Sequence, residues 1–340
     1  MAWTKPMPAN PVVAVAGATG AVGREMLLTL AQRGFPASRV VALASSRSAG
    51  KKLPFADGEL VVEEMTPASF QGVDIALFSA GAGVSKELRG AVTAAGCVMI
   101  DNSSAFRMDT DVPLVVPEVN PEDIAWHSGV IANPNCSTIQ MVVALKPLDD
   151  LARIQRVVVS TYQAASGAGA AAMEELYSQS RDFLMGQELH VEQFAHRIAF
   201  NCIPQIDVFM KDGSTKEEWK MVVETKKILH RDDLEVAATC VRVPVLRCHS
   251  EAINVEFSEP VFPGAVLEVL EDAPGITLLD YPPDGVYPMP ALLEGTDAVY
   301  IGRLRMDRSV KYGVAFWCVA DQLRKGAALN AVQIAEALLG

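Results

Sequence analysis

Residues 12–23 have the sequence VVAVAGATGAVG, a run of β-forming residues followed by a turn with three glycines, and a helical pattern continues over residues 24–33. Glycines let the backbone approach a pyrophosphate, and the N-terminus of the following helix attracts its charge. The spacing GxxGxxG differs from the more common GxGxxG, and such a turn can also simply tighten a strand–helix connection. The order of strand, turn and helix favours a dinucleotide-binding unit.

The next predicted strand, residues 39–44, ends in Ser45-Ser46-Arg47. An NAD-binding unit usually has an acidic residue here, roughly twenty residues beyond the glycines, to bind the ribose hydroxyls. Hydroxyl groups and a cation suit a ribose 2′-phosphate instead, so the sequence predicts NADP(H). The alternative is a polar loop at a strand end, with Lys51 and Lys52 as solvated charges.

Further strand-like runs at 75–78 and 98–100 are separated by helical stretches, which predicts a parallel, doubly wound α/β sheet. We expect this first domain to end near Cys136. The second domain contains the β-rich runs 156–162, 237–245 and 252–257. The last segment, 323–339, predicts an amphipathic helix that returns to pack on the first domain.

The composition limits the classes of protein to which the chain can belong. The chain has 340 residues, 50% apolar and 21% charged, and a formal net charge of −12. This is an ordinary globular composition with room for two domains. The negative charge argues against a nucleic-acid partner, which needs clustered Lys and Arg. Six cysteines without CxxC pairs predict neither a zinc site nor disulfides, as suits a reducing cytoplasm. We expect no signal peptide and no membrane span.

Residues 133–138, NPNCST, predict a loop that brings Cys136 to the start of a helix. The proline favours a turn, and Ser137 and Thr138 can cap the apolar run 139–148. Backbone N–H groups and the helix dipole at that end favour a thiolate. The alternative is that the cysteine only fills a small apolar position in the turn.

Two polar segments of the second domain follow β-rich runs. The sequence TYQAASGAG at 161–169 has small residues that permit close approach of a ligand. The sequence STKEE at 214–218 has capping-box spacing in two registers, Ser-to-Glu and Thr-to-Glu. Glu217 and Lys220 lie three apart and so share a helix face, where an exposed ion pair is the default interpretation.

Arg242 and His249 lie seven residues apart around Pro244. Their opposite parity places them on opposite faces of a straight strand. The chain must therefore bend at the proline or at a turn if both side chains are to face one site. The alternative is that His249 is a structural group.

Taken together, these motifs make the chain closely resemble the aspartate-β-semialdehyde dehydrogenase family. The matching segments follow the family order over almost the whole chain. They are GATGAVG at 17–23, SSRSAG at 45–50, DNSSAFRM at 101–108, NPNCST at 133–138, TYQAASGAG at 161–169, EEWK at 217–220, ATCVRVPV at 238–245, CHSEA at 248–252 and DQLRKGAA at 321–328.

The resemblance implies an α/β fold with a Rossmann-type dinucleotide-binding domain (1–135 with 322–340) and an α+β catalytic and dimerisation domain (136–321), in a glyceraldehyde-3-phosphate dehydrogenase-like architecture. It implies NADPH-dependent reductive dephosphorylation of L-aspartyl-4-phosphate to L-aspartate 4-semialdehyde, a step toward lysine, threonine and methionine. A cytoplasmic homodimer or homotetramer without a metal is also implied.

Carried over by motif, Cys136 is the nucleophile and His249 the acid/base. The resemblance implies that Gln163 orients the covalent intermediate, that Arg242 binds the substrate α-carboxylate, that Glu217 meets its amino group, and that Arg107 and Lys220 bind phosphate. Asn135 is a further substrate-binding residue. The implied NADP(H)-binding residues are Gly17, Thr19, Gly20, Ala21, Val22, Gly23, Ser45, Ser46, Arg47, Ser48, Ser166, Gly167 and Gln322.

Two alternatives remain at this stage. One is another enzyme with a cysteine thioester, of the N-acetyl-glutamyl-phosphate reductase or glyceraldehyde-3-phosphate dehydrogenase type. An N-acetylated substrate does not need the acidic partner that Glu217 supplies for a free amino group. The other is a catalytically silent NADP-binding scaffold, which binds the cofactor without turnover.

Overall fold

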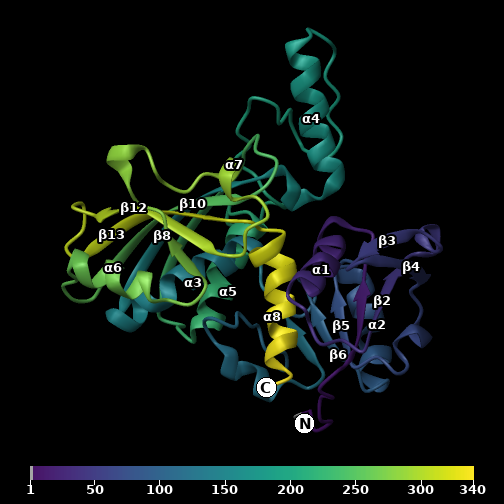
Figure 1. Ribbon diagram of the computed structural model, residues 1–340. Coiled ribbons are helices and arrows are strands. Elements are labelled where there is room, and N and C mark those ends of the chain that lie inside the picture. Colours follow the sequence, from purple (N-terminus) through teal and green to yellow (C-terminus); the bar gives the residue numbers. More distant parts are fainter. Residues whose placement is uncertain (1–2) are drawn as a thin grey trace. The chain divides into compact units, whose positions relative to one another are not determined.

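The computed structural model describes residues 3–340, which form two compact units (Figure 1). Unit 1 contains the described residues up to Asn135 together with Gly326–Gly340, and unit 2 contains Cys136–Lys325. Each unit is built on its own β-sheet. Within residues 3–340, no helix combines the length and the apolar character needed to cross a membrane.

Unit 1 is built on a seven-stranded sheet with the order β3-β4-β2-β1-β5-β6-β7. Neighbouring strands are parallel except β3, which is antiparallel to β4. Its elements are β1 (Val12–Ala16), α1 (Ala21–Gln32), β2 (Arg39–Ala44), β3 (Lys52–Phe55), β4 (Gly58–Glu64), β5 (Ile75–Phe78), α2 (Ala82–Ala94), β6 (Val98–Asp101), β7 (Val130–Ala132) and α8 (Leu329–Ala337). This is the predicted parallel α/β sheet.

The predicted element bounds of unit 1 differ from the structure in small ways. Strands 39–44 and 75–78 have the predicted bounds, and strand 98–100 gains Asp101. The first helix begins at Ala21, three residues earlier than predicted, because Gly20 is its extended N-cap. The glycine turn therefore leads directly into the helix.

The segment 323–339 is not the single amphipathic helix predicted. A π-helical turn spans Arg324–Ala328, and α8 follows it. Most of α8 is buried, and its Val332 and Ile334 belong to the core of unit 1 with Val13 of β1 and Leu27 of α1. The last helix is thus a core element and has little polar face.

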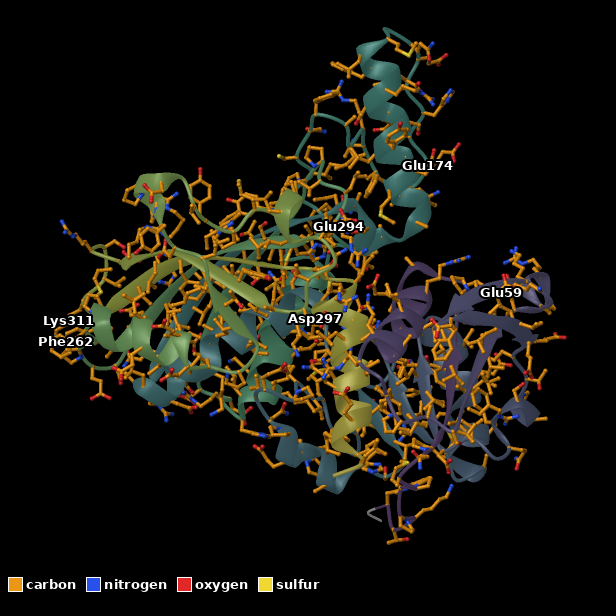
Figure 2. All side chains as sticks on the ribbon, in the orientation of Figure 1. Glu59, Glu174, Phe262, Glu294, Asp297 and Lys311 are labelled. Atoms are coloured by element: carbon orange, nitrogen blue, oxygen red, sulfur yellow. The ribbon has the colours of Figure 1, made fainter. Side chains whose placement is uncertain are left out.

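The outer edge of this sheet carries charge. Lys52 of β3 donates to Glu59 of β4 at 3.0 Å, and both side chains are exposed. Figure 2 labels Glu59 on this edge. Charged edge strands discourage pairing with another chain.

Unit 2 is built on a six-stranded sheet with the order β11-β12-β13-β10-β8-β9. Its strands are β8 (Ile154–Gln163), β9 (Glu235–Arg242), β10 (His249–Phe257), β11 (Ile276–Leu278), β12 (Val299–Met306) and β13 (Gly313–Ala320). Its helices are α3 (Cys136–Leu151), α4 (Ala170–Leu184), α5 (Lys216–Leu229), α6 (Pro263–Glu271) and α7 (Pro290–Leu293). Helix α3 packs beside both α5 and α6 on the sheet (Figure 1).

Two predicted strand ends in unit 2 are wrong. The run 237–245 was expected to be one strand, but β9 ends at Arg242, just before Val243 and Pro244. Proline cannot donate a ladder hydrogen bond, so the chain turns there. The strand predicted over 252–257 starts too late, because β10 begins at His249.

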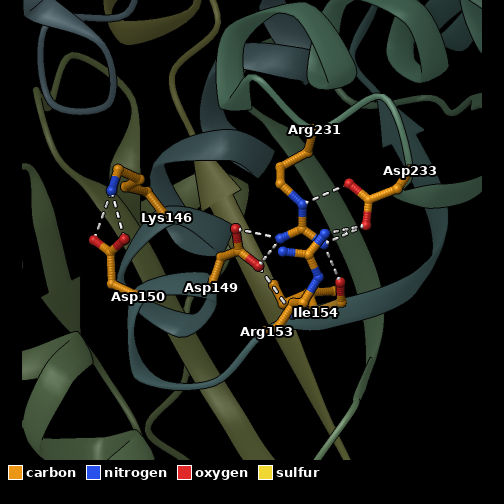
Figure 3. A network of polar contacts seen from close by, with 7 residues as sticks. All are labelled: Lys146, Asp149, Asp150, Arg153, Ile154, Arg231 and Asp233. Atoms are coloured by element: carbon orange, nitrogen blue, oxygen red, sulfur yellow. Dashed lines mark hydrogen bonds and ion pairs between the residues drawn. The ribbon is translucent and has the colours of Figure 1, made fainter.

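Arg231 connects the end of α3 and the start of β8 with the segment before β9 (Figure 3). Its guanidinium donates to Asp149 Oδ2 at 2.7 Å, to the Ile154 carbonyl at 2.7 Å and to Asp233 Oδ1 at 2.9 Å. The side chains of Arg231 and Asp149 are only 11% and 15% exposed. This pair therefore lies where water screens it little.

We expect Asp149→Ala to lower the free energy of unfolding by about 3 kcal/mol, because the shielded Arg231 Nη1 and the Ile154 N–H both lose the carboxylate that accepts from them. The matched control is Asp150→Ala, the next residue of α3, which removes an exposed pair with Lys146 worth about 0.3–0.5 kcal/mol. Denaturant unfolding followed by tryptophan fluorescence measures both. Equal losses for the two variants would contradict this account.

Candidate active site

The glycine turn of unit 1 requires glycine at two of its three positions. Gly17 has φ +89°, and a Cβ there would lie 2.3 Å from the Ser79 carbonyl oxygen. A Cβ on Gly23 would lie 2.2 Å from the Gly17 carbonyl oxygen. Gly20 is exposed, and the nearest atom to a Cβ there is 3.4 Å away. Gly17 and Gly23 are therefore required by the fold, whereas Gly20 leaves open space beside the turn.

The start of α1 fits an anion. Its N-cap, Gly20, has no side chain to bond the first N–H groups, and the first turn holds no acidic residue. Ala21 and Val22 add only small apolar side chains there, and Thr19 precedes the cap. Backbone N–H groups and the helix dipole favour negative charge at such an end. The turn therefore fits the pyrophosphate of a dinucleotide.

The end of β2 lies beside this turn, because the N–H groups of Gly17 and Ala18 donate to the Leu43 carbonyl at 2.8 and 3.0 Å. Ser45, Ser46 and Arg47 follow β2 and are exposed, and Ser48 is half-buried. Within the described part of the chain, Arg47 forms no ion pair. This set of hydroxyls and one cation fits a 2′-phosphate better than a pair of ribose hydroxyls.

The loop before Cys136 is held inside unit 1 by Asn133. Its amide donates to Asn102 and to the Ala327 carbonyl at 3.3 Å, and its oxygen accepts from Asn330 at 2.6 Å. Arg107 donates to the carbonyls of Asn133 at 3.0 Å and Asn102 at 2.9 Å. Arg107 and Asn133 are both buried. Asn330 of α8 is thus part of the support for the NPNC loop.

Helix α3 begins at Cys136 itself. Ser137 and Thr138 were predicted as caps, but both lie inside the first turn and are buried. Cys136 is only partly buried, whereas Asn135 before it is buried. The thiol therefore occupies the first helical position, closer to the positive end of the helix dipole than the prediction placed it.

Gln163, Arg242 and His249 surround the end of β8. In the sheet, β8 lies between β9 and β10, and Gln163 pairs in register with Arg242. On the other side Ser250 pairs with Tyr162, so His249 follows beside Gln163. Arg242 and His249 thus come from two strands on either side of a third. The turn between them removes the parity conflict of a single straight strand.

The backbone of Ala164 binds both of these side chains. Its N–H donates to His249 Nδ1 at 3.0 Å, and its carbonyl accepts from Arg242 Nη1 at 2.6 Å. A Cβ on Gly167 would lie 3.0 Å from Arg242 Nη1 and 3.1 Å from His249 Nε2. Both polar groups therefore border the space over Gly167.

Burial sets the electrostatics of this pair. Desolvation lowers the pKa of Arg242, while the field of Cys136 acts in the opposite direction. Full burial, and secondly the positive charge of Arg242, hold the pKa of His249 well below its ordinary value, although the Cys248 carbonyl opposes this. At neutral pH the imidazole is uncharged.

Glu217 belongs to a buried polar cluster at the start of α5. Gln163 donates to its Oε1 at 3.0 Å, and Lys220 donates to its Oε2 at 3.0 Å. Lys220 also donates to Asp207 at 2.8 Å. Burial alone acts to lower the pKa of Lys220, but the attraction of Glu217 and Asp207 outweighs it and raises that pKa. The predicted pair is thus shielded from water and includes a second carboxylate.

The helix α5 itself starts with one of the two predicted capping boxes. Thr215 N–H donates to Glu218 Oε2 at 2.7 Å, and Glu218 N–H donates to Thr215 Oγ1 at 3.3 Å. In this register Glu218 completes the capping box, and the side chain of Glu217 binds Gln163 and Lys220.

Ser166 and Gln322 form a separate pair. Gln322 Nε2 donates to Ser166 Oγ, and Gln322 Oε1 accepts from the Cys248 N–H at 2.8 Å. Both residues are buried. The Gln322 side chain and the backbone N–H of Ser166, which donates to the Leu246 carbonyl at 3.1 Å, thus hold the end of the turn that leads from Arg242 to His249.

Sequence reasoning missed Asp207 and the backbone of Ala164. Asp207 lies in a loop nine residues before Lys216, with no motif that marks it as the second partner of Lys220. The role of Ala164 comes from its N–H and carbonyl, which every residue except proline possesses. No sequence signal identifies either. In the described residues, no group of three or more His, Cys, Asp or Glu side chains is placed to hold a metal.

Two family models cover most of the chain. The semialdehyde dehydrogenase NAD-binding domain matches residues 12–127, and the semialdehyde dehydrogenase dimerisation domain matches residues 145–325. The class of protein is therefore that of the semialdehyde dehydrogenases.

Comparison with curated relatives and solved structures identifies the family within this class. The aspartate-semialdehyde dehydrogenase of Aquifex aeolicus is 55% identical, covering 96% of this chain and 97% of that protein. That of Bacillus subtilis is 51% identical over 96% of each. A crystal structure of aspartate semialdehyde dehydrogenase II from Vibrio cholerae, complexed with ASA, is 48% identical with a TM-score of 0.94, covering 97% of this chain and 98% of that one. The chain belongs to the aspartate-semialdehyde dehydrogenase family.

These matches confirm several predictions made from the sequence, namely the resemblance, the two-domain α/β fold, and an oxidoreductase function in aspartate-family amino-acid biosynthesis. NADP(H) as cofactor is confirmed as well. An aspartate semialdehyde dehydrogenase from Candida albicans, 27% identical with a TM-score of 0.74 over 97% of this chain and 98% of that one, was solved with NADP.

Substitutions of Gly17 and Gly20 distinguish an effect on stability from an effect on NADPH binding. We expect Gly17→Ala to lower stability by about 1–3 kcal/mol, because a Cβ at φ +89° also meets the Ser79 carbonyl. Gly20→Ala costs less, about 0.5–1 kcal/mol, because alanine is a poorer N-cap than glycine. It weakens NADPH binding about tenfold or more, since its Cβ intrudes on the pyrophosphate. Thermal unfolding and fluorescence titration with NADPH measure the two effects. Unchanged NADPH affinity in Gly20→Ala would refute the assigned space.

Proposed function

We propose that this enzyme works through a thioester on Cys136. A free cysteine has a pKa of about 8.5, so only a small fraction is thiolate at neutral pH without help. The position of Cys136 at the start of α3, partly exposed and within the field of Arg242, supports an enriched thiolate there.

The thiolate of Cys136 attacks the acyl carbon of L-aspartyl-4-phosphate, and the C–O bond to phosphate breaks to release phosphate and leave the thioester. Bound NADPH supplies the hydride that reduces a thioester to an aldehyde. His249 stands beside the reacting carbonyl as the acid/base group, and Gln163 and Asn135 orient the covalent intermediate and substrate. The contacts of Gln163 with Glu217 support its fixed orientation.

The rest of the site supports an amino-acid substrate. Arg242 would bind the α-carboxylate through the planar fork that two parallel hydrogen bonds require. Glu217 would bind the free α-amino group, which distinguishes aspartyl from N-acetylated substrates. Arg107 and Lys220 would bind phosphate. The carboxylate of Asp207 weakens the attraction of Lys220 for phosphate, so this role requires Asp207 to give way.

The two units would then divide the work. We propose residues 1–135 with 322–340 as the NADP(H)-binding domain and 136–321 as the catalytic domain. Gly17 to Gly23, Ser45 to Ser48, Ser166, Gly167 and Gln322 would serve the cofactor. The protein would act in the cytoplasm as a homodimer or homotetramer, as the match of a dimerisation-domain model supports.

Cys136→Ala is expected to lower turnover by about 10⁴-fold or more, because no thioester can form. NADPH affinity should stay at the wild-type value. The assay follows phosphate-dependent NADP reduction with L-aspartate 4-semialdehyde, with N-acetylglutamate semialdehyde and glyceraldehyde 3-phosphate as parallel substrates. Retained activity in the variant would refute the thioester. Wild-type turnover of a parallel substrate alone would overturn the roles of Glu217 and Arg242, and no turnover at all would favour the silent scaffold.

Arg47→Ala is expected to weaken NADPH binding about tenfold while leaving NADH binding unchanged, because only NADPH carries the 2′-phosphate. Lys51→Ala is the matched control, a nearby exposed cation without this role. Dissociation constants for both coenzymes with each variant decide the point. A parallel loss for NADPH and NADH in Arg47→Ala would rule out the 2′-phosphate contact.

A further inference from the structure

Two rows of side chains cross the sheet of unit 2, one behind the other on the same face. The row at the strand ends contains the candidate site residues and consists of Ala320, His249, Gln163 and Arg242. The second row lies two residues further from those ends and consists of Cys318, Glu251, Thr161 and Cys240. Residues two apart in a strand share a face, so the second row supports the first. Thr161 Oγ1 donates to Gln163 Oε1 at 3.3 Å, which connects the two rows.

Glu251 brings into the second row a carboxyl group that the proposed reaction does not use. It is fully buried, and within residues 3–340 neither carboxyl oxygen has a partner in hydrogen-bond geometry. Full burial raises the pKa of Glu251 well above its ordinary value, and Gln140 opposes this shift. Cys240 and Cys318, the titratable neighbours in the row, are uncharged at neutral pH because burial raises their pKa as well. Glu251 is therefore a neutral carboxylic acid at neutral pH.

Gln140 of α3 is the side chain that faces this acid. It is buried and near enough to act on the pKa of Glu251 by hydrogen bonding, yet its amide nitrogen and oxygen have no aligned partner among the described residues. An amide and a neutral carboxylic acid each offer a donor and an acceptor. The acid O–H can donate to the amide oxygen while the amide N–H donates to the acid carbonyl. A small adjustment would thus satisfy both groups, which is favoured because buried polar atoms without partners cost free energy.

The place of Gln140 on α3 relates this pair to the nucleophile. Cys136 and Gln140 lie four residues apart in the helix, so they share a face and are separated by about 6 Å along its axis. His249 and Glu251 lie two apart in β10 and are separated by about 7 Å along the strand. Because the two spacings nearly match, a bond between Gln140 and Glu251 fixes how far α3 is shifted along β10. It therefore also fixes where Cys136 lies relative to His249.

We propose that Gln140 and Glu251 form a buried amide–carboxylic acid pair that fixes the start of α3 on β10 and so positions Cys136 for attack. Both are positioning residues, because they act through the helix and touch neither substrate nor cofactor. The inference rests on the proposed role of Cys136 as the nucleophile. A reacting group misplaced by about 1 Å can lower the rate about 10²-fold, so a pair one turn away has a measurable effect.

The kinetic test uses Glu251→Leu, which removes the pair and keeps the side chain large. It should lower kcat about 10–100-fold and change KM for L-aspartate 4-semialdehyde by less than about threefold, because the groups proposed to bind substrate lie on other elements. Ile253→Ala, the next residue on this face of β10, is the control for lost stability. It should lower the midpoint of urea unfolding and leave kcat within about twofold. Equal kcat losses in the two variants would show that Glu251 is only structural.

Exchanging the two groups tests the pair itself. Gln140→Glu alone should lower kcat about tenfold or more, because two buried carboxyl groups then face each other. Adding Glu251→Gln restores an amide opposite an acid, and we expect kcat to return to within about threefold of the wild type. A double variant no more active than Gln140→Glu overturns the proposed pairing.

Infrared difference spectroscopy of the full-length protein at neutral pH, wild type minus Glu251→Gln, detects the proton on Glu251 without turnover. We expect the C=O band of a protonated carboxylic acid, and carboxylate bands in its place would refute the acid–amide pair. This result is independent of the thioester. If Cys136→Ala remains active, the thioester is wrong even where the acid band is present. If a thioester is trapped on Cys136 while Glu251→Leu matches Ile253→Ala in kcat, only the positioning role is wrong.

Discussion

The backbone of Ala164 is the constraint on which the candidate site in unit 2 depends. Its N–H and its carbonyl bind His249 and Arg242, and neither bond can change donor or acceptor roles. A side chain in that role could titrate or rotate, whereas an amide next to a strand end does neither. The main chain of Ala164 thus sets the orientation of the His249 and Arg242 side chains.

That course is in turn set by the sheet. Because β8 lies between β9 and β10, Ala164, which follows the last residue of β8, has a neighbouring strand on each side. The returning turn is tied to the segment after β8, since Val243 N–H donates to the Gln163 carbonyl at 3.0 Å and Ala165 N–H donates to the Val245 carbonyl at 2.8 Å. The bend at Pro244 therefore follows the end of β8. This explains why residues seven apart with opposite parity border the same space.

The sequence predicted what depends on local pattern and missed what depends on distant partners. The strands 39–44 and 75–78 are short apolar runs between turn segments, and their bounds agree with the structure. The end of β9 was misplaced because apolar residues continue past Arg242 and the proline alone marks the turn.

Asn133 and Asn330 lie 197 positions apart, and nothing local marks their hydrogen bond. The same holds for Asp207 and Lys220. Motif recognition proposed candidate site residues, but the contacts among them could be described only from the fold.

Burial also distinguishes the six cysteines of the chain from one another. Burial raises the pKa of Cys97 and of Cys248 to about 12, and it raises the pKa of Cys240 and Cys318 as well. These four thiols stay protonated at neutral pH, and a thiol is a far weaker nucleophile than a thiolate. Cys136 differs from these four, because it is only partly buried and lies at a helix N-terminus, where backbone N–H groups favour negative charge. Cys202 is exposed but lies in no helix or strand and so has no helix dipole to favour its thiolate. Selectivity among the thiols therefore follows from where each one sits in the fold, and only one position combines access with a field that favours negative charge.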